Sequence, residues 1–298
     1  MDYKSKIILI AGPTASGKSK IAIKLAKKIN GEIINADSMQ VYKEFKILTA
    51  RPIKKDEKQV KHHLYGFCSV KKNFSSGEWL KHCITTIKKL RKKRKTPIIV
   101  GGTGLYFKAL VDGLVKIPKI PIRIRNLIIN DQKKLGQKLF YEKLVKLDKL
   151  VKKNVSPQDV QRSIRAFEVK KYTKISLFKW FNQTRKNFED KDFYKLYVDV
   201  PKQILSKRIK KRIERMLKDG AFYEVDKFLK MKIKKNNNSN KIIGVREIED
   251  YLNSEKKDIN YLKELLLIKT RQYAKRQRTW SKKFMNDWDK IDYKDKLS

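Results

Sequence analysis

A phosphate-binding loop is the most specific chemical signal in this sequence. Residues 12–19 match the pattern G-x-x-x-x-G-K-[ST], and they lie between an apolar run and a segment with helical periodicity. Backbone N–H groups in such a loop converge on one anion, the lysine adds a positive charge, and the final hydroxyl can bind Mg²⁺. We expect a ligand that contains a diphosphate to bind to Gly12, Pro13, Thr14, Ala15, Ser16, Gly17, Lys18 and Ser19.

Two other strand-like segments end in residues that could act on this ligand. Asp37 follows the run 32–36, and Gly101-Gly102-Thr103-Gly104 follows the run 96–100. An ATPase or kinase needs an acidic residue at a second strand end to organise Mg²⁺ and water, and the second run ends without one. Local sequence leaves Asp37 equally open to being a metal ligand, a general base or a helix N-cap. Thr103 is either a cap for the next helix or a hydroxyl for the bound diphosphate.

The elements that must position these residues indicate an α/β fold. Apolar strand-like runs occur at 6–10, 32–36, 96–100 and 193–200. Helical periodicity occurs between them, at 19–29 and 76–94, and again after Pro201. Strands that alternate with helices predict a parallel sheet flanked by helices, of the P-loop type.

The character of the chain changes near residue 116. Residues 116–186 have helical patterns and no strong strand candidate, which predicts an all-helical insertion. We therefore expect a P-loop α/β core formed by 1–115 and 187–298, with an insertion domain at 116–186. Within the core, 231–241 reads as a polar loop, and 259 to about 288 as a long basic helix.

The composition is strongly basic, with 75 Lys and Arg against 31 Asp and Glu and a formal charge of +44. Either contact with polyanions or an AT-rich coding bias, which enriches Lys, Ile and Asn together, accounts for this charge. The positions of the arginines are therefore more informative than the number of lysines. Two cysteines, no secretory h-region and no apolar run near 20 residues predict a cytoplasmic protein without a membrane segment.

Taken in order, the motifs resemble those of the bacterial tRNA dimethylallyltransferases. The resemblance begins with the phosphate-binding loop and continues through 37–42 (DSMQVY), 49–52 (TARP), 62–64 (HHL) and 100–106 (VGGTGLY). It extends through 159–169 in the insertion, Arg208, Arg212 and Met216, then 243–247 and 271–280. It therefore covers nearly the whole chain, and only the loop motif is specific by itself.

The resemblance implies transfer of a dimethylallyl group from its diphosphate to N6 of the adenosine immediately 3′ of a tRNA anticodon. The loop would then hold the diphosphate of a prenyl donor, which explains the missing second acid. The resemblance also makes Asp37 the general base and Thr103 a contact of the donor's bridging oxygen. Arg212 would neutralise the diphosphate, and Ser19 would bind the cofactor Mg²⁺. A monomer is expected.

The resemblance further implies contacts with the tRNA anticodon stem-loop. Some lie beside the reacting base, some in the insertion and some near the C-terminus. The implied residues are Asp37, Ser38, Met39, Gln40, Arg125, Gln161, Arg162, Ser163, Ile164, Arg165, Arg246, Lys275, Arg276 and Gln277. His62 and His63 are expected to be buried structural residues.

Three other functions remain open from the sequence. An enzyme that prenylates free adenine nucleotides would share the loop, Asp37 and Thr103, but would have little use for Arg162 and Arg165. A small-molecule kinase is disfavoured by the missing second acid. A basic RNA-binding protein with a vestigial loop would not need Lys18 and Asp37 together.

Overall fold

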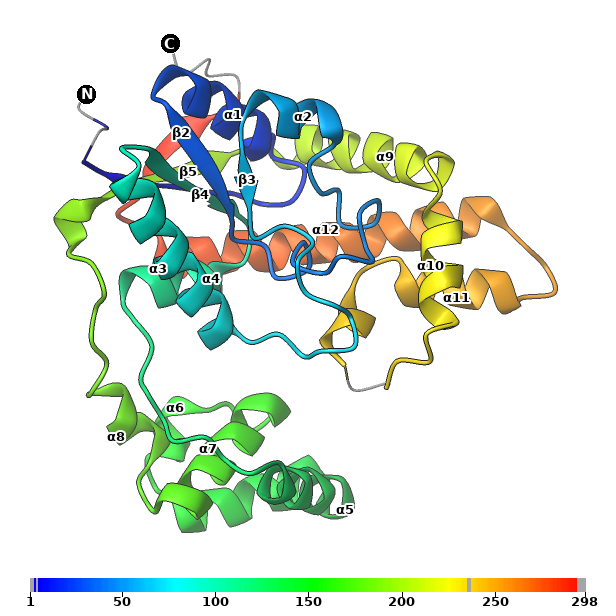
Figure 1. Ribbon diagram of the computed structural model, residues 1–298. Helices are drawn as coiled ribbons and strands as arrows, with labels where there is room; N and C mark the ends of the chain where they lie inside the picture. Colours follow the sequence, from blue (N-terminus) through cyan, green and yellow to red (C-terminus); the bar gives the residue numbers. More distant parts are fainter. Residues whose placement is uncertain (1–2, 4, 235–236, 294–298) are drawn as a thin grey trace. The chain divides into compact units, whose positions relative to one another are not determined.

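The computed structural model describes residues 3, 5–234 and 237–293. The chain forms two compact units (Figure 1). Unit 1 combines residues 1–111 with 188–298, and unit 2 comprises residues 112–187.

Unit 1 is built on a six-stranded parallel sheet with the strand order β3-β2-β4-β1-β5-β6. The strands are β1 (Ile7–Ala11), β2 (Gly31–Asn35), β3 (His62–His63), β4 (Thr96–Gly101), β5 (Phe193–Asp199) and β6 (Asp289–Asp292). The four predicted strands and their parallel pairing are confirmed. The sequence did not predict β3 and β6, because β3 has two residues and β6 has only one apolar side chain, Ile291.

Both faces of the sheet are buried, as expected for a parallel sheet with helices on each side. In the central strand β1, Ile8 and Ile10 pack in one apolar cluster with residues of α1 (Lys18–Lys28) and α9 (Lys202–Lys218). The alternate residues Ile7 and Leu9 are fully buried on the opposite face. This face lies toward α3 (Ser76–Lys92) and α4 (Gly104–Val111), where Trp79 stacks on Tyr106 with 4.3 Å between the rings.

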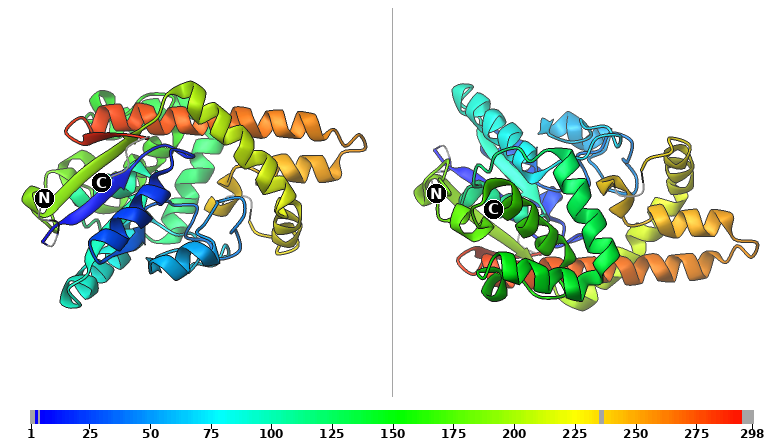
Figure 2. Two further views of the ribbon diagram at one scale, coloured as in Figure 1. Left: turned by 90° about the horizontal axis from the view of Figure 1, so that it is seen from above. Right: turned by 90° about the horizontal axis from the view of Figure 1, so that it is seen from below.

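Unit 1 has four further helices among its described residues. They are α2 (Lys54–Gln59), α10 (Ala221–Leu229), α11 (Val245–Asn253) and α12 (Ile259–Phe284). The long helix α12 packs against α9 and α4 (Figure 2). Two short 3₁₀ turns occupy 190–192 and 238–241, the second within the segment predicted as a loop. Residues 235 and 236 of that predicted loop lie outside the described residues.

The prediction that the last helix reaches residue 288 was wrong. Helix α12 ends at Phe284, and the chain then pairs with β5 as strand β6. Met285 and Trp288 are buried in this connection, and the Trp288 ring meets the edge of Phe107 at 5.4 Å. Burial of the Trp288 side chain against α4 overrides the helical periodicity that the sequence shows there.

Unit 2 contains helices only. They are α5 (Ile122–Leu147), α6 (Val151–Asn154), α7 (Val160–Thr173) and α8 (Leu177–Phe181). Its core forms where α5 and α7 pack together, with Phe140 stacked on Phe167 at 5.1 Å. Gly136 interrupts α5 with a φ of 71°, so the helix has two segments. In the described part of the chain, no helix combines the length and the apolar character needed to cross a membrane.

Candidate active site

The phosphate-binding loop connects the end of β1 to the start of α1. Gly17 caps the helix with a φ of 94°, a conformation that favours glycine. Gly12 lies so close to β5 that a Cβ atom would be 3.1 Å from the Val198 carbonyl oxygen. Glycine is therefore favoured at the two positions for different reasons. Gly17 adopts a left-handed backbone conformation, and Gly12 lies close to the backbone of β5.

Lys18 is half-buried at the first position of α1. Its Nζ donates a hydrogen bond to the carbonyl oxygen of Pro13 at 3.2 Å, so the side chain folds back over the loop. Burial lowers the pKa of Lys18 to about 8, while the nearby charge of Asp37 acts in the opposite direction. The lysine is therefore held at low solvent exposure close to a carboxylate, where an incoming phosphate would strengthen its charged form.

Two arginines of α9, four residues apart, attach this helix to the loop. Arg212 donates from Nη1 to Thr14 Oγ1 at 2.8 Å and from Nη2 to the Leu48 carbonyl oxygen at 3.2 Å. Burial lowers the pKa of Arg212, and Asp37 again opposes the shift. Arg208 donates to the Ser16 carbonyl oxygen at 2.8 Å. No role for Arg208 was predicted from the sequence, although its spacing from Arg212 on one helix face was a usable signal.

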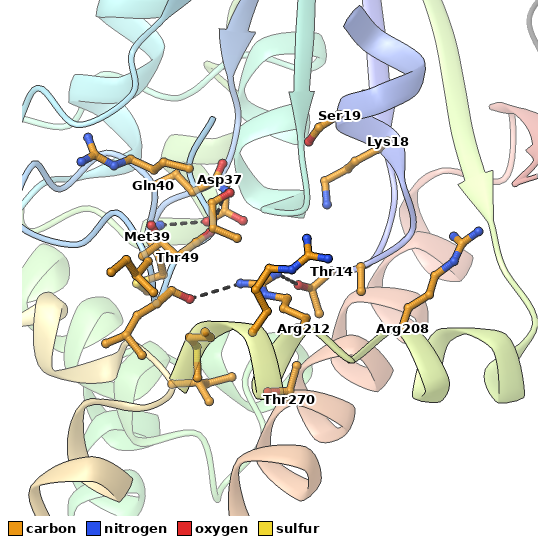
Figure 3. A pocket seen from close by; sticks show the side chains of 18 of the residues that line it. Thr14, Lys18, Ser19, Asp37, Met39, Gln40, Thr49, Arg208, Arg212 and Thr270 are labelled. Carbon is orange, nitrogen blue, oxygen red and sulfur yellow. Dashed lines mark hydrogen bonds between the residues drawn. The ribbon is translucent and has the colours of Figure 1, made fainter. Parts of the chain in front are cut away.

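Asp37 lies at the carboxyl end of β2, in a turn and not at the start of a helix. The N-cap alternative is therefore wrong. Its backbone is fixed by Asn35, whose Oδ1 accepts the Asp37 N–H at 2.8 Å and whose Nδ2 donates to the Asp37 carbonyl at 2.9 Å. Oδ1 of Asp37 accepts the Met39 N–H at 2.9 Å, and the residue lines a large cavity. These contacts orient the carboxylate toward the same space as Lys18 (Figure 3).

The glycine turn 101–104 packs closely against other parts of unit 1. A Cβ at Gly101 would be 2.0 Å from the Ala36 carbonyl oxygen, and one at Gly104 would be 2.2 Å from the Trp280 ring. Thr103 Oγ1 accepts the Ser38 N–H at 2.9 Å and also interacts with the Tyr273 side chain. Thr103 is therefore connected to the segment that carries Asp37.

Gln277 of α12 connects two of the predicted site segments. Its Oε1 accepts the Thr14 N–H at 2.8 Å, and its Nε2 donates to the Gly102 carbonyl oxygen at 2.9 Å. Both ends of the side chain are therefore in use within the protein. The side chain joins the phosphate-binding loop to the glycine turn, and the expected contact of Gln277 with RNA stays a prediction.

A cavity of about 1170 Å³ opens among these residues within unit 1 (Figure 3). It exceeds the roughly 300–1,000 Å³ of common small-molecule sites, so it has room for more than a diphosphate. Asp37 and Asp219 are the carboxylates among the described lining residues. The basic residues there are Lys18, Lys20, Lys24, Lys46, Arg51, Arg208, Lys211, Arg212, Arg215, Lys241 and Arg276. This imbalance suits an anionic ligand.

Several residues predicted to contact tRNA lie at or near this cavity. Met39 and Gln40 line it, and Gln40 Nε2 donates to the carbonyl oxygens of residues 49 and 50. Arg276 also lines it, with its guanidinium 5.8 Å from the Tyr273 ring centre. Lys275 and Arg246 are exposed on α12 and α11 and do not belong to the cavity wall as described.

The predicted tRNA contacts of the insertion lie in unit 2. Gln161 and Arg162 are exposed at the start of α7, where Arg162 Nε is 3.4 Å from the Asp159 carboxylate. Arg165 donates to the buried carboxylate of Glu168 at 2.6 Å, and Arg125 Nε is 3.8 Å from the same carboxylate. The charges of Arg125 and Arg165 are thus partly engaged inside the unit.

The structure corrects one predicted contact of the insertion, that of the Ser163 side chain. The Ser163 side chain is fully buried and accepts a hydrogen bond from Gln137 Nε2 at 3.2 Å. Ile164 packs against the core of unit 2. The helical period turns Ser163 toward the core, so its side chain is not presented as an RNA contact, whereas Ile164 is partly exposed and stays a predicted contact. Unit 2 has a similar share of Lys and Arg to the remainder, with 20 of its 76 residues against 55 of the other 222.

The paired histidines form β3. His62 Nδ1 is 2.7 Å from the Val60 carbonyl oxygen, and His63 Nε2 is 2.6 Å from Glu32. Both side chains are half-buried rather than fully buried. Among the described residues no cluster of His, Cys, Asp and Glu could hold a metal ion.

The parallel sheet, the loop after β1 and the basic cavity define an α/β protein of the P-loop type with a cavity suited to an anionic ligand. The chain belongs to the IPP transferase family, whose model matches residues 40–284. Relatives agree with this membership. The chain is 56% identical to a tRNA dimethylallyltransferase of Pelagibacter ubique, covering 98% of this chain and 93% of the relative. It is 39% identical to one of Allorhizobium ampelinum, covering 98% and 96%.

Solved structures show the same fold. A tRNA isopentenylpyrophosphate transferase of Bacillus halodurans aligns with a TM-score of 0.68 at 29% identity, covering 97% of this chain and 90% of that one. A eukaryotic dimethylallyltransferase acting on tRNA aligns with a TM-score of 0.85 at 28% identity, covering 98% and 74%. The predicted family and fold class are thereby confirmed.

Proposed function

We propose that this protein transfers a dimethylallyl group from dimethylallyl diphosphate to N6 of the adenosine immediately 3′ of the anticodon in tRNA. The observation that carries the proposal is one cavity in which the carboxylate of Asp37 faces two half-buried cations, Lys18 and Arg212. The relatives named above are tRNA dimethylallyltransferases, which supports the same reaction.

In the proposed step Asp37 is the general base. A bond forms between N6 and the allylic carbon, the bond from that carbon to the diphosphate oxygen breaks, and Asp37 takes the N6 proton. An exocyclic amine conjugated to adenine is a weak nucleophile, so a positioned base contributes about 10²–10⁴-fold. The hydrogen bond from Met39 N–H to one carboxylate oxygen holds the group in place while leaving the other for substrate.

The departing diphosphate carries the developing negative charge. Lys18, Arg212 and the loop N–H groups are preorganised donors for it, and their burial strengthens the interaction. Thr103 is proposed to contact the bridging oxygen through a hydroxyl held beside Ser38. The Ser19 hydroxyl lines the cavity next to Lys18, which fits Mg²⁺ because that ion takes few protein ligands and binds substrate phosphates. When bound, Mg²⁺ would neutralise part of the diphosphate charge.

The acceptor adenine must leave its stack with neighbouring bases to reach such a cavity. Enzymes that modify a nucleobase extrude it in this way. We propose that Ser38, Met39 and Gln40 contact the base, and that unit 2, with Gln161 and Arg162 exposed, contacts the anticodon stem-loop. Lys275, Arg276 and Arg246 are proposed to contact tRNA from unit 1. We also propose that the protein acts as a monomer.

A label-transfer assay tests the proposal. Purified protein, Mg²⁺ and labelled dimethylallyl diphosphate are incubated with tRNA in one tube and with AMP or ATP in another. The proposal predicts label in tRNA alone. Label in the free nucleotide alone would identify an enzyme of the cytokinin type, and label in neither, beside an active control enzyme, would refute prenyl transfer.

A further inference from the structure

A buried carboxylate outside the predicted site supports one wall of the cavity. Glu224 of α10 is 9% exposed. Its Oε1 accepts the N–H groups of Lys46 at 2.5 Å and Ile47 at 2.8 Å, and its Oε2 accepts the Leu48 N–H at 2.9 Å. Three consecutive peptide groups bound to one carboxylate have a fixed orientation, and the buried carboxylate in turn requires such donors.

The segment 46–51 that Glu224 holds lines the cavity at every residue. Its carbonyl groups bind two side chains of the proposed site. The Leu48 carbonyl accepts from Arg212 Nη2 at 3.2 Å, and the Thr49 and Ala50 carbonyls accept from Gln40 Nε2 at 2.8 and 3.1 Å. Glu224 therefore fixes the position of this short segment. The segment in turn positions Arg212, which is proposed to bind the diphosphate, and Gln40, which is proposed to lie beside the acceptor base.

We propose that Glu224 is a positioning residue for the transfer reaction, acting through segment 46–51 on Arg212 and Gln40. This inference rests on the proposed function, which assigns Arg212 to the diphosphate and Gln40 to the acceptor base. Glu224 itself touches no substrate in this arrangement. Its role is to fix the Leu48 peptide, so that Arg212 can bind the Leu48 carbonyl and Thr14 at the same time.

The geometry requires a carboxylate and not merely a polar group of that size. Three N–H donors meet the two Glu224 oxygens. A glutamine has the same shape but offers one oxygen, and its NH₂ group would face at least one N–H donor. That peptide would move or lose its hydrogen bond. A shift of about 1 Å at a catalytic group can cost about 10²-fold in rate.

Apolar contacts hold α10 against the same region independently of the carboxylate. The Phe45 and Phe228 rings lie 4.8 Å apart, and Ile47 lies close to Gly220 at the start of the helix. These contacts support folding of a Glu224→Gln variant, so its effect can be separated from loss of structure.

The first experiment compares Glu224→Gln with Glu44→Gln. Glu44 also accepts a backbone N–H, that of Val70, and the Ser69 hydroxyl, but it neither lines the cavity nor bonds to segment 46–51. We expect Glu224→Gln to weaken binding of inorganic pyrophosphate, measured by calorimetry, about tenfold, and to lower kcat/KM about 10- to 100-fold. Glu44→Gln should leave both unchanged. Wild-type affinity and turnover in a folded Glu224→Gln variant would overturn the proposal.

A double-mutant cycle distinguishes positioning from general loosening. If Glu224 acts through Arg212, then Glu224→Gln should weaken pyrophosphate binding much less in an Arg212→Ala background. Additive losses would overturn the proposal. If the glutamine variant fails to fold, Glu224→Asp, which keeps the charge on a shorter side chain, enters the same cycle with the same criterion. Because pyrophosphate binding needs no tRNA, the cycle tests the role of Glu224 even if wild-type protein fails to prenylate tRNA.

Discussion

Replacing Asp37 by asparagine tests its proposed role as the general base separately from its role in shaping the site. The turn around residue 37 is held chiefly through its backbone, by two hydrogen bonds to Asn35. An asparagine Oδ1 can still accept the Met39 N–H that the carboxylate accepts at 2.9 Å. The shape of the site should therefore survive while the proton acceptor is lost.

Two effects then contribute to the expected loss of turnover. Loss of the base lowers kcat by about 10²–10⁴-fold. In addition, the Asp37 charge opposes the burial that lowers the Lys18 pKa to about 8, so its removal lowers that pKa further. More of the lysine becomes neutral at and above this pH, which weakens diphosphate binding. Lowering the pH restores the charge of Lys18 but cannot restore the base.

Single-turnover transfer to tRNA, measured well below and just above pH 8, separates the two effects. Asp37→Asn should retain the roughly 10²–10⁴-fold loss of rate at the lower pH, with near wild-type affinity for pyrophosphate there. The control is Asp219→Asn, which removes the other described carboxylate of the cavity wall and should retain turnover. Wild-type turnover by Asp37→Asn at the lower pH would refute its role as base.

Three further substitutions test other parts of the site. Gly101→Ala places a Cβ 2.0 Å from the Ala36 carbonyl oxygen and should lower the free energy of unfolding by about 1–3 kcal/mol. The control Gly77→Ala, whose nearest contact would be at 3.9 Å, should leave it unchanged. Equal melting temperatures of the two variants would contradict this packing. Gln277→Ala should weaken pyrophosphate binding about tenfold and leave tRNA affinity unchanged. A selective loss of tRNA affinity would instead identify Gln277 as an RNA contact. Arg162→Ala should weaken tRNA binding and reduce the slope of log affinity against log salt by about one, and an unchanged slope would remove it from the RNA interface.

The sequence predicted the parts of the site that lie in contiguous motifs. The loop before Lys18 and the turn after β4 have strong local requirements, such as a glycine at a φ of 94° or a backbone 2.0 Å from a hypothetical Cβ. These requirements act within a few residues of strand ends. Parallel strands then bring the ends together, so Asp37 and Lys18 could be placed in one site before the fold was known.

Contacts between distant segments were not predictable in the same way. Gln277 and Thr14 are 263 residues apart in the sequence, and Glu224 and Lys46 are 178 residues apart. Both side chains look like ordinary polar residues of helices until the packing of α12 and α10 is known. The prediction that Ser163 contacts RNA was wrong for a different reason. Ser163 lies within a contiguous motif, but on the buried side of its helix.

Locating the added group on the product tRNA tests the proposed function most directly. Two tRNA transcripts, one with adenosine immediately 3′ of the anticodon and one with guanosine there, are incubated with dimethylallyl diphosphate and the protein, then digested and analysed by mass spectrometry. We predict dimethylallyl on N6 of that adenosine and no adduct on the second transcript. An adduct at another nucleotide, or equal modification of both transcripts, would contradict the proposed function.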